Sequence, residues 1–234
     1  MFTGIVQEVA TISACNDLDG LRTITLKLTP EFCKGLVIGA SVSVDGVCLT
    51  VSKIHDQGLV DFDIMLQSLK ITTLADAKAE SQVNVERSAK EGAEVGGHIL
   101  SGHVDCRAKI IEIQKPPNNW MVRFEIEPKW MRYIFSKGFL AINGASLTVS
   151  EINKEKNYFE VWLIPETLRC TTFSEKQVGD FVNIEIERST QIVVDAVRTA
   201  VEEQVQLLFP NKTAAQQLIL QNKLEATVSP ALVY

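Results

Sequence analysis

The chain has 234 residues, of which 46% are apolar and 22% charged, and its 23 basic and 29 acidic side chains give a formal charge of −6. An acidic balance without a Lys/Arg cluster argues against a nucleic-acid partner. No apolar run approaches the roughly 18 residues of a membrane span, and the N-terminal MFTGIVQEV lacks the basic start of a signal peptide. Five widely spaced cysteines without a C-x-x-C pair indicate reduced thiols, and neither a disulfide framework nor a zinc ribbon. We therefore expect a soluble, cytoplasmic protein with no membrane, nucleic-acid or metal partner.

The second half of the chain repeats the first. Residues 42–54 (VSVDGVCLTVSKI) align without a gap with residues 140–152 (LAINGASLTVSEI), at an offset of 98. Solenoid repeats have periods of roughly 20 to 50 residues, so this period indicates duplicated whole domains. The predicted organisation is one domain over 1–97, a second over 98–189, a helix over 190–209 and a tail over 210–234.

Apolar residues alternate within each copy as they do in strands. In the second copy Trp120, Val122, Phe124 and Ile126 lie at every second position, which places one face of the segment on a core. A short helix is predicted to open after Pro30, and another after Pro128. The predicted strands of the first copy lie near 4–12, 20–28, 40–44, 47–54, 59–65 and 83–87.

The central hairpin of each copy has a characteristic turn. Asp45-Gly46, and Asn143-Gly144 in the second copy, favour two-residue type I′ turns because both residues tolerate positive φ. Six short antiparallel strands in fewer than about 100 residues fit a small closed barrel, which leaves no exposed sheet edge. The sequence therefore predicts an all-β fold of two tandem, Greek-key-like barrels, followed by a C-terminal helix.

The segment after the second copy has a helical pattern. Its apolar residues recur at spacings of three and four until Pro210, and they are Val194, Val197, Val201, Val205 and Leu208. Such a stripe needs a partner surface, and the pattern leaves open whether that surface is another subunit or a barrel of the same chain. A second, weakly helical stretch from Ala214 to Leu224 has no predicted role.

Familiar nucleotide and metal motifs do not occur in the sequence. There is no G-x-G-x-x-G after a strand, no Walker loop and no H-E-x-x-H. His98 and His103 are five residues apart, which places them on opposite faces of a strand, so a shared metal ion is not expected.

Polar residues share a strand face at the same place in both copies. Cys48 and Thr50 lie on one face of the predicted strand, and Ser146 and Thr148 lie on the matching face in the second copy. Such faces at a barrel mouth suit the binding of a polar ring system. The alternative is that Cys and Thr, as good strand residues, simply pack there.

His103 and Lys137 distinguish the second copy from the first. His103 shares a predicted strand face with Asp105 and stands where the first copy has Ile5, so it is a candidate general base or orienting group. A purely structural histidine is the alternative. Lys137 stands where the first copy has Gly39, and it either neutralises an anion or is a solvated lysine.

Together these motifs closely resemble the riboflavin synthase family. In the family's order, over about residues 1–208, they are MFTGIV (1–6), GVCLTV (46–51), GGHILSGHVD (96–105), KGF (137–139), NGASLTV (143–149) and IPETL (164–168). The resemblance implies lumazine-binding barrels and the dismutation of two molecules of 6,7-dimethyl-8-ribityllumazine to riboflavin and 5-amino-6-ribitylaminouracil, with no external cofactor. It also implies a homotrimer held by the C-terminal helix, with the active site between the N-terminal barrel of one subunit and the C-terminal barrel of its neighbour. It leaves open whether a lumazine synthase shell encloses the trimer.

The resemblance implies two groups of binding positions. In the N-terminal barrel they are Gly4, Ile5, Val6, Cys48, Leu49, Thr50, Asp63, Ile64, Met65, Leu66, Gln67 and Ser68. In the C-terminal barrel they are Gly102, His103, Val104, Lys137, Ser146, Leu147, Thr148, Trp162, Leu163, Ile164, Pro165, Glu166 and Thr167. Our hypothesis is that Ser146, Thr148 and His103 assist deprotonation or nucleophile addition. Cys48 and Thr50 then orient the second molecule, and Glu187 is the acidic group after the last barrel strand, where the family usually has Asp.

The first copy departs from the family's pattern. Gln67 and Ser68 stand where the second copy keeps Glu166 and Thr167, and Asp45 stands where Asn is usual. Two other classes of protein are alternatives: a non-catalytic lumazine- or flavin-binding paralogue, like the antenna proteins of luminous bacteria, and an oligomeric scaffold. The intact motifs of the second copy favour the enzyme over the antenna, and a scaffold leaves the aligned polar faces unexplained.

Overall fold

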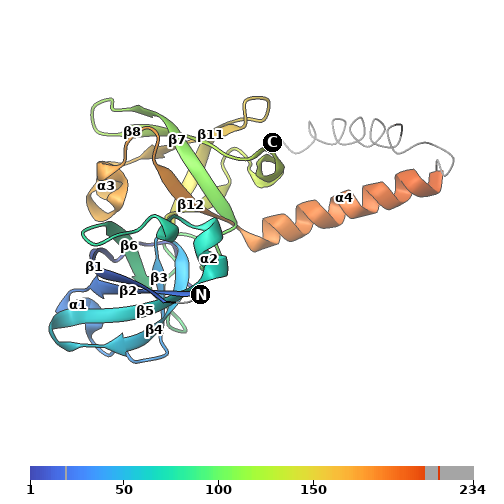
Figure 1. The fold of residues 1–234 in the computed structure, drawn as a ribbon. Coiled ribbons are helices and arrows are strands. Elements are labelled where there is room, and N and C mark those ends of the chain that lie inside the picture. The colour runs from blue at the N-terminus through green and yellow to red at the C-terminus, as the bar shows by residue number, and fades with distance from the viewer. Residues whose placement is uncertain (19, 209–215, 217–234) are drawn as a thin grey trace. The chain divides into compact units, whose positions relative to one another are not determined.

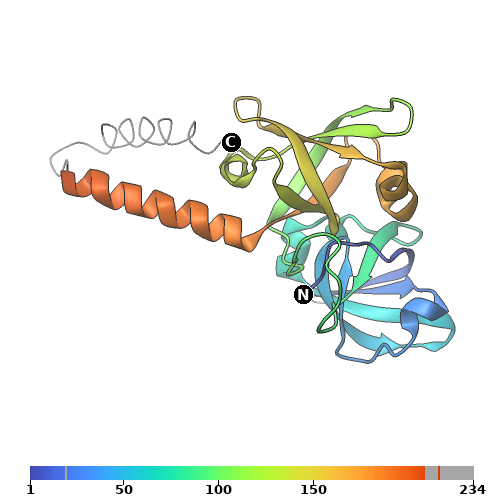
Figure 2. The ribbon, with the colours of Figure 1, turned by 180° about the vertical axis from the view of Figure 1, so that it is seen from behind.

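The computed structural model describes residues 1–18, 20–208 and 216. Met1–Glu187 form one compact unit, and Arg188 opens a second. The first unit consists of two closed antiparallel barrels of six strands each (Figure 1, Figure 2). The predicted fold class, two tandem six-stranded barrels and a C-terminal helix, is confirmed.

The N-terminal barrel closes in the order β1-β2-β5-β4-β3-β6. Its strands are β1 (Glu8–Leu18), β2 (Leu21–Lys27), β3 (Ser41–Val44), β4 (Val47–Ile54), β5 (Leu59–Met65) and β6 (Gln82–Arg87). Helices α1 (Pro30–Cys33) and α2 (Leu66–Ile71) and the 3₁₀ turns η1 (Asp56–Gly58) and η2 (Thr73–Ala75) lie between them. Five of the six predicted strands agree within one residue at each end; β1 begins four residues later than predicted and ends later.

The C-terminal barrel closes in the order β10-β11-β8-β7-β12-β9. Its strands are β7 (Cys106–Gln114), β8 (Trp120–Glu125), β9 (Phe139–Ile142), β10 (Ala145–Asn153), β11 (Tyr158–Leu163) and β12 (Phe181–Ile186). The helical segments are η3 (Pro128–Tyr133), α3 (Pro165–Cys170) and η4 (Thr172–Glu175). Helices open at Pro30 and Pro128 as predicted, although the one at Pro128 is of the 3₁₀ type.

The two predicted hairpin turns lie against each other. Asp45 and Asn143 both have φ of 45°, and Gly46 and Gly144 have φ of 82° and 79°, as the predicted type I′ turns require. A Cβ on Gly46 would lie 2.8 Å from the backbone nitrogen of Gly144, and the reverse distance is 2.9 Å. Glycine therefore serves twice at this point, because it permits the turn and lets the two barrels touch.

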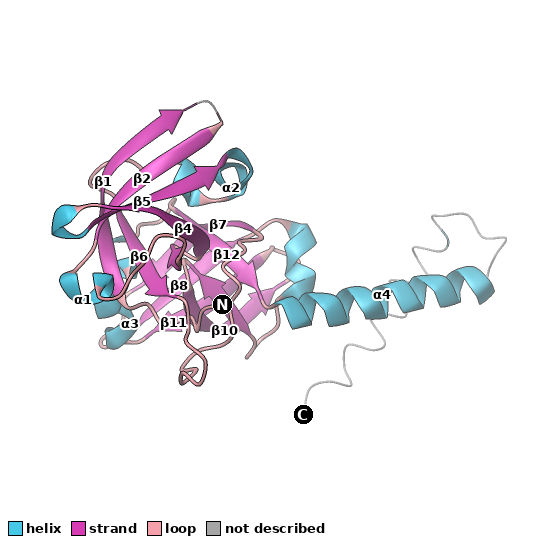
Figure 3. Ribbon diagram, turned by 90° about the horizontal axis from the view of Figure 1, so that it is seen from below, coloured by secondary structure: helices cyan, strands magenta, loops and turns pink. Residues whose placement is uncertain are grey.

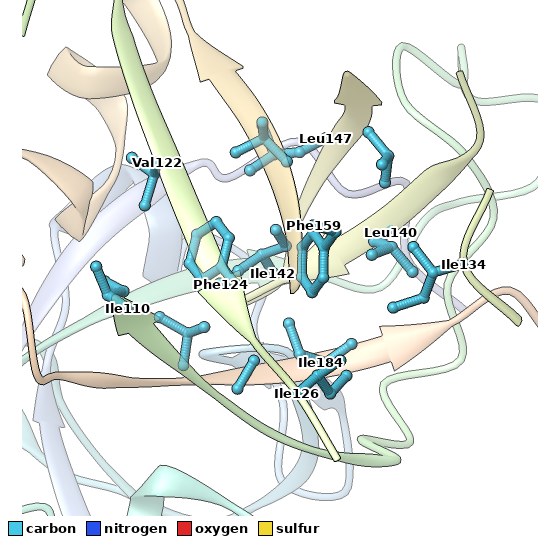
Figure 4. Close-up of a cluster of buried hydrophobic side chains, with 14 of the residues drawn as sticks. Ile110, Val122, Phe124, Ile126, Ile134, Leu140, Ile142, Leu147, Phe159 and Ile184 are labelled. Atoms are coloured by element: carbon cyan, nitrogen blue, oxygen red, sulfur yellow. The ribbon is translucent and has the colours of Figure 1, made fainter. Parts of the chain in front are cut away.

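Each barrel is filled by the inward side chains of its strands. In the C-terminal barrel Phe124 and Phe159 stack with ring centroids 5.2 Å apart, and Ile110, Leu147 and Ile184 surround them (Figure 4). The other barrel has its own cluster of buried aliphatic residues around Phe62. The inward faces are thus occupied by packed cores, so polar chemistry is confined to the outer faces and the strand ends.

The second unit begins with helix α4 (Arg188–Leu208), close to the predicted 190–209 (Figure 3). Val197 and Leu208, both members of the predicted stripe, are exposed. The end of the helix at Pro210 and the stretch from Ala214 to Leu224 lie outside the described residues, apart from residue 216. Within the described part of the chain, no helix combines the length and apolarity needed to cross a membrane.

Candidate active site

The segment in front of each barrel runs along a strand of the other barrel. The backbone nitrogen of Ser146 donates to the carbonyl of Gly4 at 2.8 Å, and that of Cys48 donates to the carbonyl of Gly102, also at 2.8 Å. Gly4 and Gly102 have φ of 75° and 79°, and a Cβ on either would lie within 2.6 Å of a side-chain carbon of the facing strand. Glycine is therefore required at both crossing points.

This crossing corrects the grouping of the predicted binding positions. The sequence groups the segment 4–6 with β4 and the segment 102–104 with β10, whereas the structure places 4–6 along β10 and 102–104 along β4. The packing explains the exchange, because Val104 is buried in the N-terminal core and Val6 packs against the C-terminal core. It also explains why β1 begins at Glu8 instead of residue 4. A repeat shows which positions are equivalent, but not which copy each one contacts.

A buried glutamate holds each crossing segment. Glu185 accepts hydrogen bonds from the nitrogen and hydroxyl of Ser101, both at 2.7 Å, and from the nitrogen of Gly102 at 2.9 Å. Glu86 holds Thr3 and Gly4 in the same way, at 2.6, 2.8 and 3.0 Å. Burial raises the pKa of Glu86, and these hydrogen bonds oppose the shift. Neither glutamate is among the predicted site residues, although a polar Asn-x-Glu inside two otherwise apolar strands is a usable signal.

Two asparagines, one in β6 with Glu86 and one in β12 with Glu185, link the barrels directly. The Asn84 side chain donates to the carbonyl of Asn143 at 2.9 Å, and the Asn183 side chain donates to the carbonyl of Asp45 at 2.8 Å. All four residues are buried. The contact is thus symmetric, and it fixes the relation between β4 and β10.

The predicted polar faces are confirmed by the burial pattern. Thr50 and Thr148 are exposed and Cys48 and Ser146 are half-buried, while the leucine between each pair is buried in its barrel. Both faces point away from the packed cores. The segment 102–104 borders the face on β4, and the segment 4–6 borders the face on β10. Equivalent segments therefore border the two faces.

The structure adds a histidine to the face on β10. His98 Nδ1 lies 2.6 Å from Ser146 Oγ, and its ring stacks on Phe139 at 5.6 Å. Burial lowers the pKa of His98, and the charge of Glu187 partly offsets this. The spacing of His98 and His103 bears only on a shared metal ion, so this contact was not predicted. The preceding Gly96-Gly97 is a signal for a close approach.

His103 and Asp105 lie in the segment before β7, not in the strand predicted for them. His103 is exposed, and its backbone nitrogen donates to the Ser101 hydroxyl at 3.2 Å. Asp105 accepts from the backbone nitrogen of Ile186 at 2.8 Å. The crossing places His103 on the side of β4, beside Cys48, and away from the Ser146 face to which the sequence analysis assigned it.

Lys137 has a left-handed backbone, with φ of 66°, where the first copy has Gly39 with φ of 88°. A side chain in this region costs about 1 kcal/mol or more, so a lysine here is strained relative to glycine. Lys137 is exposed, and its backbone nitrogen donates to the carbonyl of Val149 at 2.8 Å.

The remaining predicted positions lie where β5 passes into α2 and where β11 passes into α3. Large apolar side chains are exposed at both junctions, namely Met65, Leu66, Trp162 and Ile164. Glu166 is bound by Arg169 at 2.6 Å, which lowers the pKa of Glu166 to about 2. The second junction therefore carries an ionised carboxylate paired with Arg169, which Gln67 does not supply at the first.

A lumazine binding domain model matches residues 3–88 and again residues 101–187. The chain is 44% identical to riboflavin synthase of Escherichia coli (strain K12) over 198 residues, 84% of this chain and 92% of that protein. The chain belongs to the riboflavin synthase family. Identity is 41% to riboflavin synthase of Buchnera aphidicola subsp. Schizaphis graminum (strain Sg), over 89% of this chain and all of that protein. It is 36% to riboflavin synthase of Mycobacterium tuberculosis (strain ATCC 25618 / H37Rv), over 86% of this chain and all of that protein.

Solved structures show the same fold at lower identity. LumP complexed with riboflavin superposes with a TM-score of 0.75 at 24% identity, over 80% of this chain and all of that one. LumP complexed with 6,7-dimethyl-8-(1'-D-ribityl) lumazine gives 0.73 at 23% identity, over the same shares of the two chains. Membership of the riboflavin synthase family confirms the resemblance that the motifs indicated.

Proposed function

We propose that the protein is a riboflavin synthase, a cytoplasmic transferase that dismutates two molecules of 6,7-dimethyl-8-ribityllumazine. One molecule gives a four-carbon unit to the other, which yields riboflavin and 5-amino-6-(D-ribitylamino)uracil without an external cofactor. The names of the curated relatives and the twofold match to a lumazine-binding domain support this proposal.

The observation that carries the proposal is the pair of similar but non-identical polar faces on β4 and β10. A reaction between two identical molecules needs two sites of one shape held in a fixed relation, because orientation supplies much of the rate. It also needs the sites to differ, since donor and acceptor must be told apart. Two pairs of equivalent positions differ in this way: Cys48 in the first copy corresponds to Ser146 in the second, and Gly39 corresponds to Lys137.

The substrate supplies its own acidic 7-methyl group and an electrophilic ring carbon, so the protein has to move protons and stabilise the deprotonated form. We assign Ser146 and Thr148 to this task at the C-terminal barrel. His103, with Cys48 and Thr50, orients the second molecule at the N-terminal barrel, a revision that follows from the crossing of the segments. The negative charge of Glu187 acts on His98, whose pKa it raises, and His98 in turn contacts Ser146.

The proposal includes a homotrimer in which the exposed apolar residues of α4 meet those of other copies. The active site then lies between the N-terminal barrel of one subunit and the C-terminal barrel of its neighbour. The mass of the protein in solution, with and without Val197→Lys, tests the assembly. The same measurement in the presence of lumazine synthase tests that partner.

One assay separates the proposed function from its alternatives. Purified protein is incubated with 6,7-dimethyl-8-ribityllumazine, and riboflavin is followed by its absorbance. Riboflavin formation is expected. A bound chromophore without turnover would instead indicate a non-catalytic lumazine-binding paralogue, and neither signal would indicate a scaffold.

Ser146→Ala and His103→Ala are each expected to lower kcat at least about tenfold, because each removes a group that handles or orients the reacting molecules. Ser150→Ala is the matched control, since this hydroxyl lies in the same strand as Ser146 and binds the carbonyl of Glu160 at 3.0 Å. Unchanged turnover in both test variants would contradict the assigned roles.

Lys137→Gly is expected to separate binding from stability. Glycine relieves the left-handed backbone, so the free energy of unfolding rises by up to about 1 kcal/mol. The lost charge lowers the affinity for the lumazine about tenfold, the effect of one hydrogen bond to a charged group. Asn118→Gly is the control, because Asn118 has φ of 69° but lies outside the predicted site. Fluorescence titration and urea unfolding measure the two effects, and unchanged affinity would make Lys137 a solvated lysine.

A further inference from the structure

The linker between the barrels, which joins β6 to β7, places His98 beside the polar face on β10. Its Nδ1 lies 2.6 Å from Ser146 Oγ, while its Nε2 is buried and has no hydrogen-bond partner among the described residues. Phe139 stacks on the ring with an interplanar angle of 23°. The imidazole is thus held by one hydrogen bond and one ring contact, and both direct Nδ1 at Ser146.

The approach of His98 depends on the residue before it. A Cβ on Gly97 would lie 2.7 Å from Ser146 Cβ and 2.3 Å from the carbonyl oxygen of Thr3. No side chain fits there unless Ser146 or the Thr3 backbone shifts. The position of His98 is therefore built into the packing between the linker, β10 and the N-terminal segment.

The protonation state of His98 suits it to accept a proton. Burial lowers its pKa below the ordinary 6.5, and Glu187 is the charged group whose attraction partly opposes this shift. At neutral pH the ring is therefore neutral and one of its nitrogens carries a lone pair. A separation of 2.6 Å requires a hydrogen between Nδ1 and the serine oxygen.

We propose that His98 positions the Ser146 hydroxyl and accepts its proton during turnover. The proposal rests on the proposed function. A 7-methyl C–H bond of the bound lumazine breaks and its proton passes to Ser146 Oγ, while the Ser146 hydroxyl proton passes to His98 Nδ1. The electron pair of the C–H bond stays on the lumazine as the exomethylene anion. The negative charge of Glu187 stabilises the imidazolium, and the protons return by the reverse steps.

The first copy has no equivalent arrangement. Cys48 replaces Ser146, and in the described part of the chain its thiol makes no hydrogen bond. The proton transfer is thereby assigned to the C-terminal barrel, which makes the lumazine bound there the carbon acid of the pair.

His98→Asn tests the proposal, because the asparagine side-chain oxygen can still accept a hydrogen bond from the Ser146 hydroxyl but cannot take up its proton. We expect kcat to fall about a hundredfold, and riboflavin affinity, measured by fluorescence quenching, to stay within about threefold. In the native protein kcat should fall on the acid side with a pKa below 6.5, since protonated His98 cannot accept, and this acid limb should vanish in the variant. His55→Asn is the matched control, because His55 also bonds a side chain, Asp61, at 2.7 Å.

Equal losses of kcat and affinity with the acid limb retained would show a structural role and overturn the proposal. Nitrogen-15 NMR of the native protein gives a second test that needs no turnover. Nδ1 of His98 is expected to be unprotonated at neutral pH, and a protonated Nδ1 would overturn its role as acceptor. If the native protein makes no riboflavin, the proposed function fails, and the NMR result still decides what His98 can do.

Discussion

Asp45→Asn is expected to make the protein more stable at neutral pH and to remove a pH dependence from its unfolding. Asp45 is fully buried at the turn between β3 and β4, and burial raises its pKa from 3.8 to about 6. The hydrogen bond from the Asn84 nitrogen, at 2.8 Å, and the charge of Lys176 offset only part of that shift. The folded protein therefore keeps the Asp45 proton to a higher pH than the unfolded chain does.

The sign of the effect follows from this order of the pKa values. Between about pH 4 and pH 6 the folded state binds more protons than the unfolded state, so the free energy of unfolding falls as the pH rises. A shift of about two units corresponds to about 3 kcal/mol. Asparagine keeps the oxygen that accepts from Asn84 and carries no charge. The advantage of Asp45→Asn should thus grow by about 3 kcal/mol between pH 4 and pH 8.

The second copy provides the control for this prediction. Asn143 occupies the equivalent position, and its side-chain oxygen accepts from the Asn183 nitrogen at 2.7 Å, but its buried amide nitrogen has no partner among the residues that the structure describes. An unpaired donor costs about 1 kcal/mol or more, so the net gain of Asp45→Asn at neutral pH is about 2 kcal/mol. Asn143→Asp should show the opposite pH dependence. Urea unfolding at several pH values measures both, and a constant difference between Asp45→Asn and the native chain would contradict the prediction.

Glu185→Gln is expected to destabilise the protein by about 3 to 4 kcal/mol and to lower its activity as well. The Glu185 carboxylate accepts three hydrogen bonds from Ser101 and Gly102 and is buried. In glutamine one of these oxygens becomes an NH₂ group, which meets a backbone N–H donor at close range. Charge-assisted bonds are lost and a buried donor is left unpaired, and both effects lower stability.

Activity falls in the same variant because Glu185 holds the segment that carries His103 along β4. Glu86→Gln should act in the same way on the segment at β10. Glu151→Gln is the control, since Glu151 is an exposed glutamate of the C-terminal barrel and such changes alter stability by less than about 0.5 kcal/mol. Thermal unfolding and the riboflavin assay give the two readouts. A Glu185→Gln variant as stable as the control would show that the carboxylate does not hold the segment.

The fold could be predicted from the sequence because its signals are local. Alternation of apolar residues, the Asp45-Gly46 turn and the three- and four-residue spacing within 190–209 each describe a few adjacent residues. The repeat then extends each of these signals for strands and turns from one copy to the other. The polar faces on β4 and β10 were predictable for the same reason, since a strand alone decides which side chains share a face.

The site could be predicted only in part because its other contacts join distant segments. Nothing in the spacing shows that residues 4–6 border β10, or that His98 contacts Ser146. Glu86 and Glu185 were not predicted because most of their partners are backbone groups of a distant segment, which leave no trace in the sequence. The buried polar residue in an apolar strand is the one signal available, and it shows that a partner exists without identifying it.

The contacts between the barrels have a consequence for the ancestry of the chain. They are isologous, in that residue i of one copy meets residue j of the other and j meets i, as in a twofold homodimer. A single-barrel protein with this sequence pattern would have every group needed to pair with a copy of itself. Joining two such barrels in one polypeptide keeps these reciprocal contacts and allows the two halves to carry different residues at equivalent positions. The copies differ in this way where Cys48 is equivalent to Ser146 and where Gly39 is equivalent to Lys137.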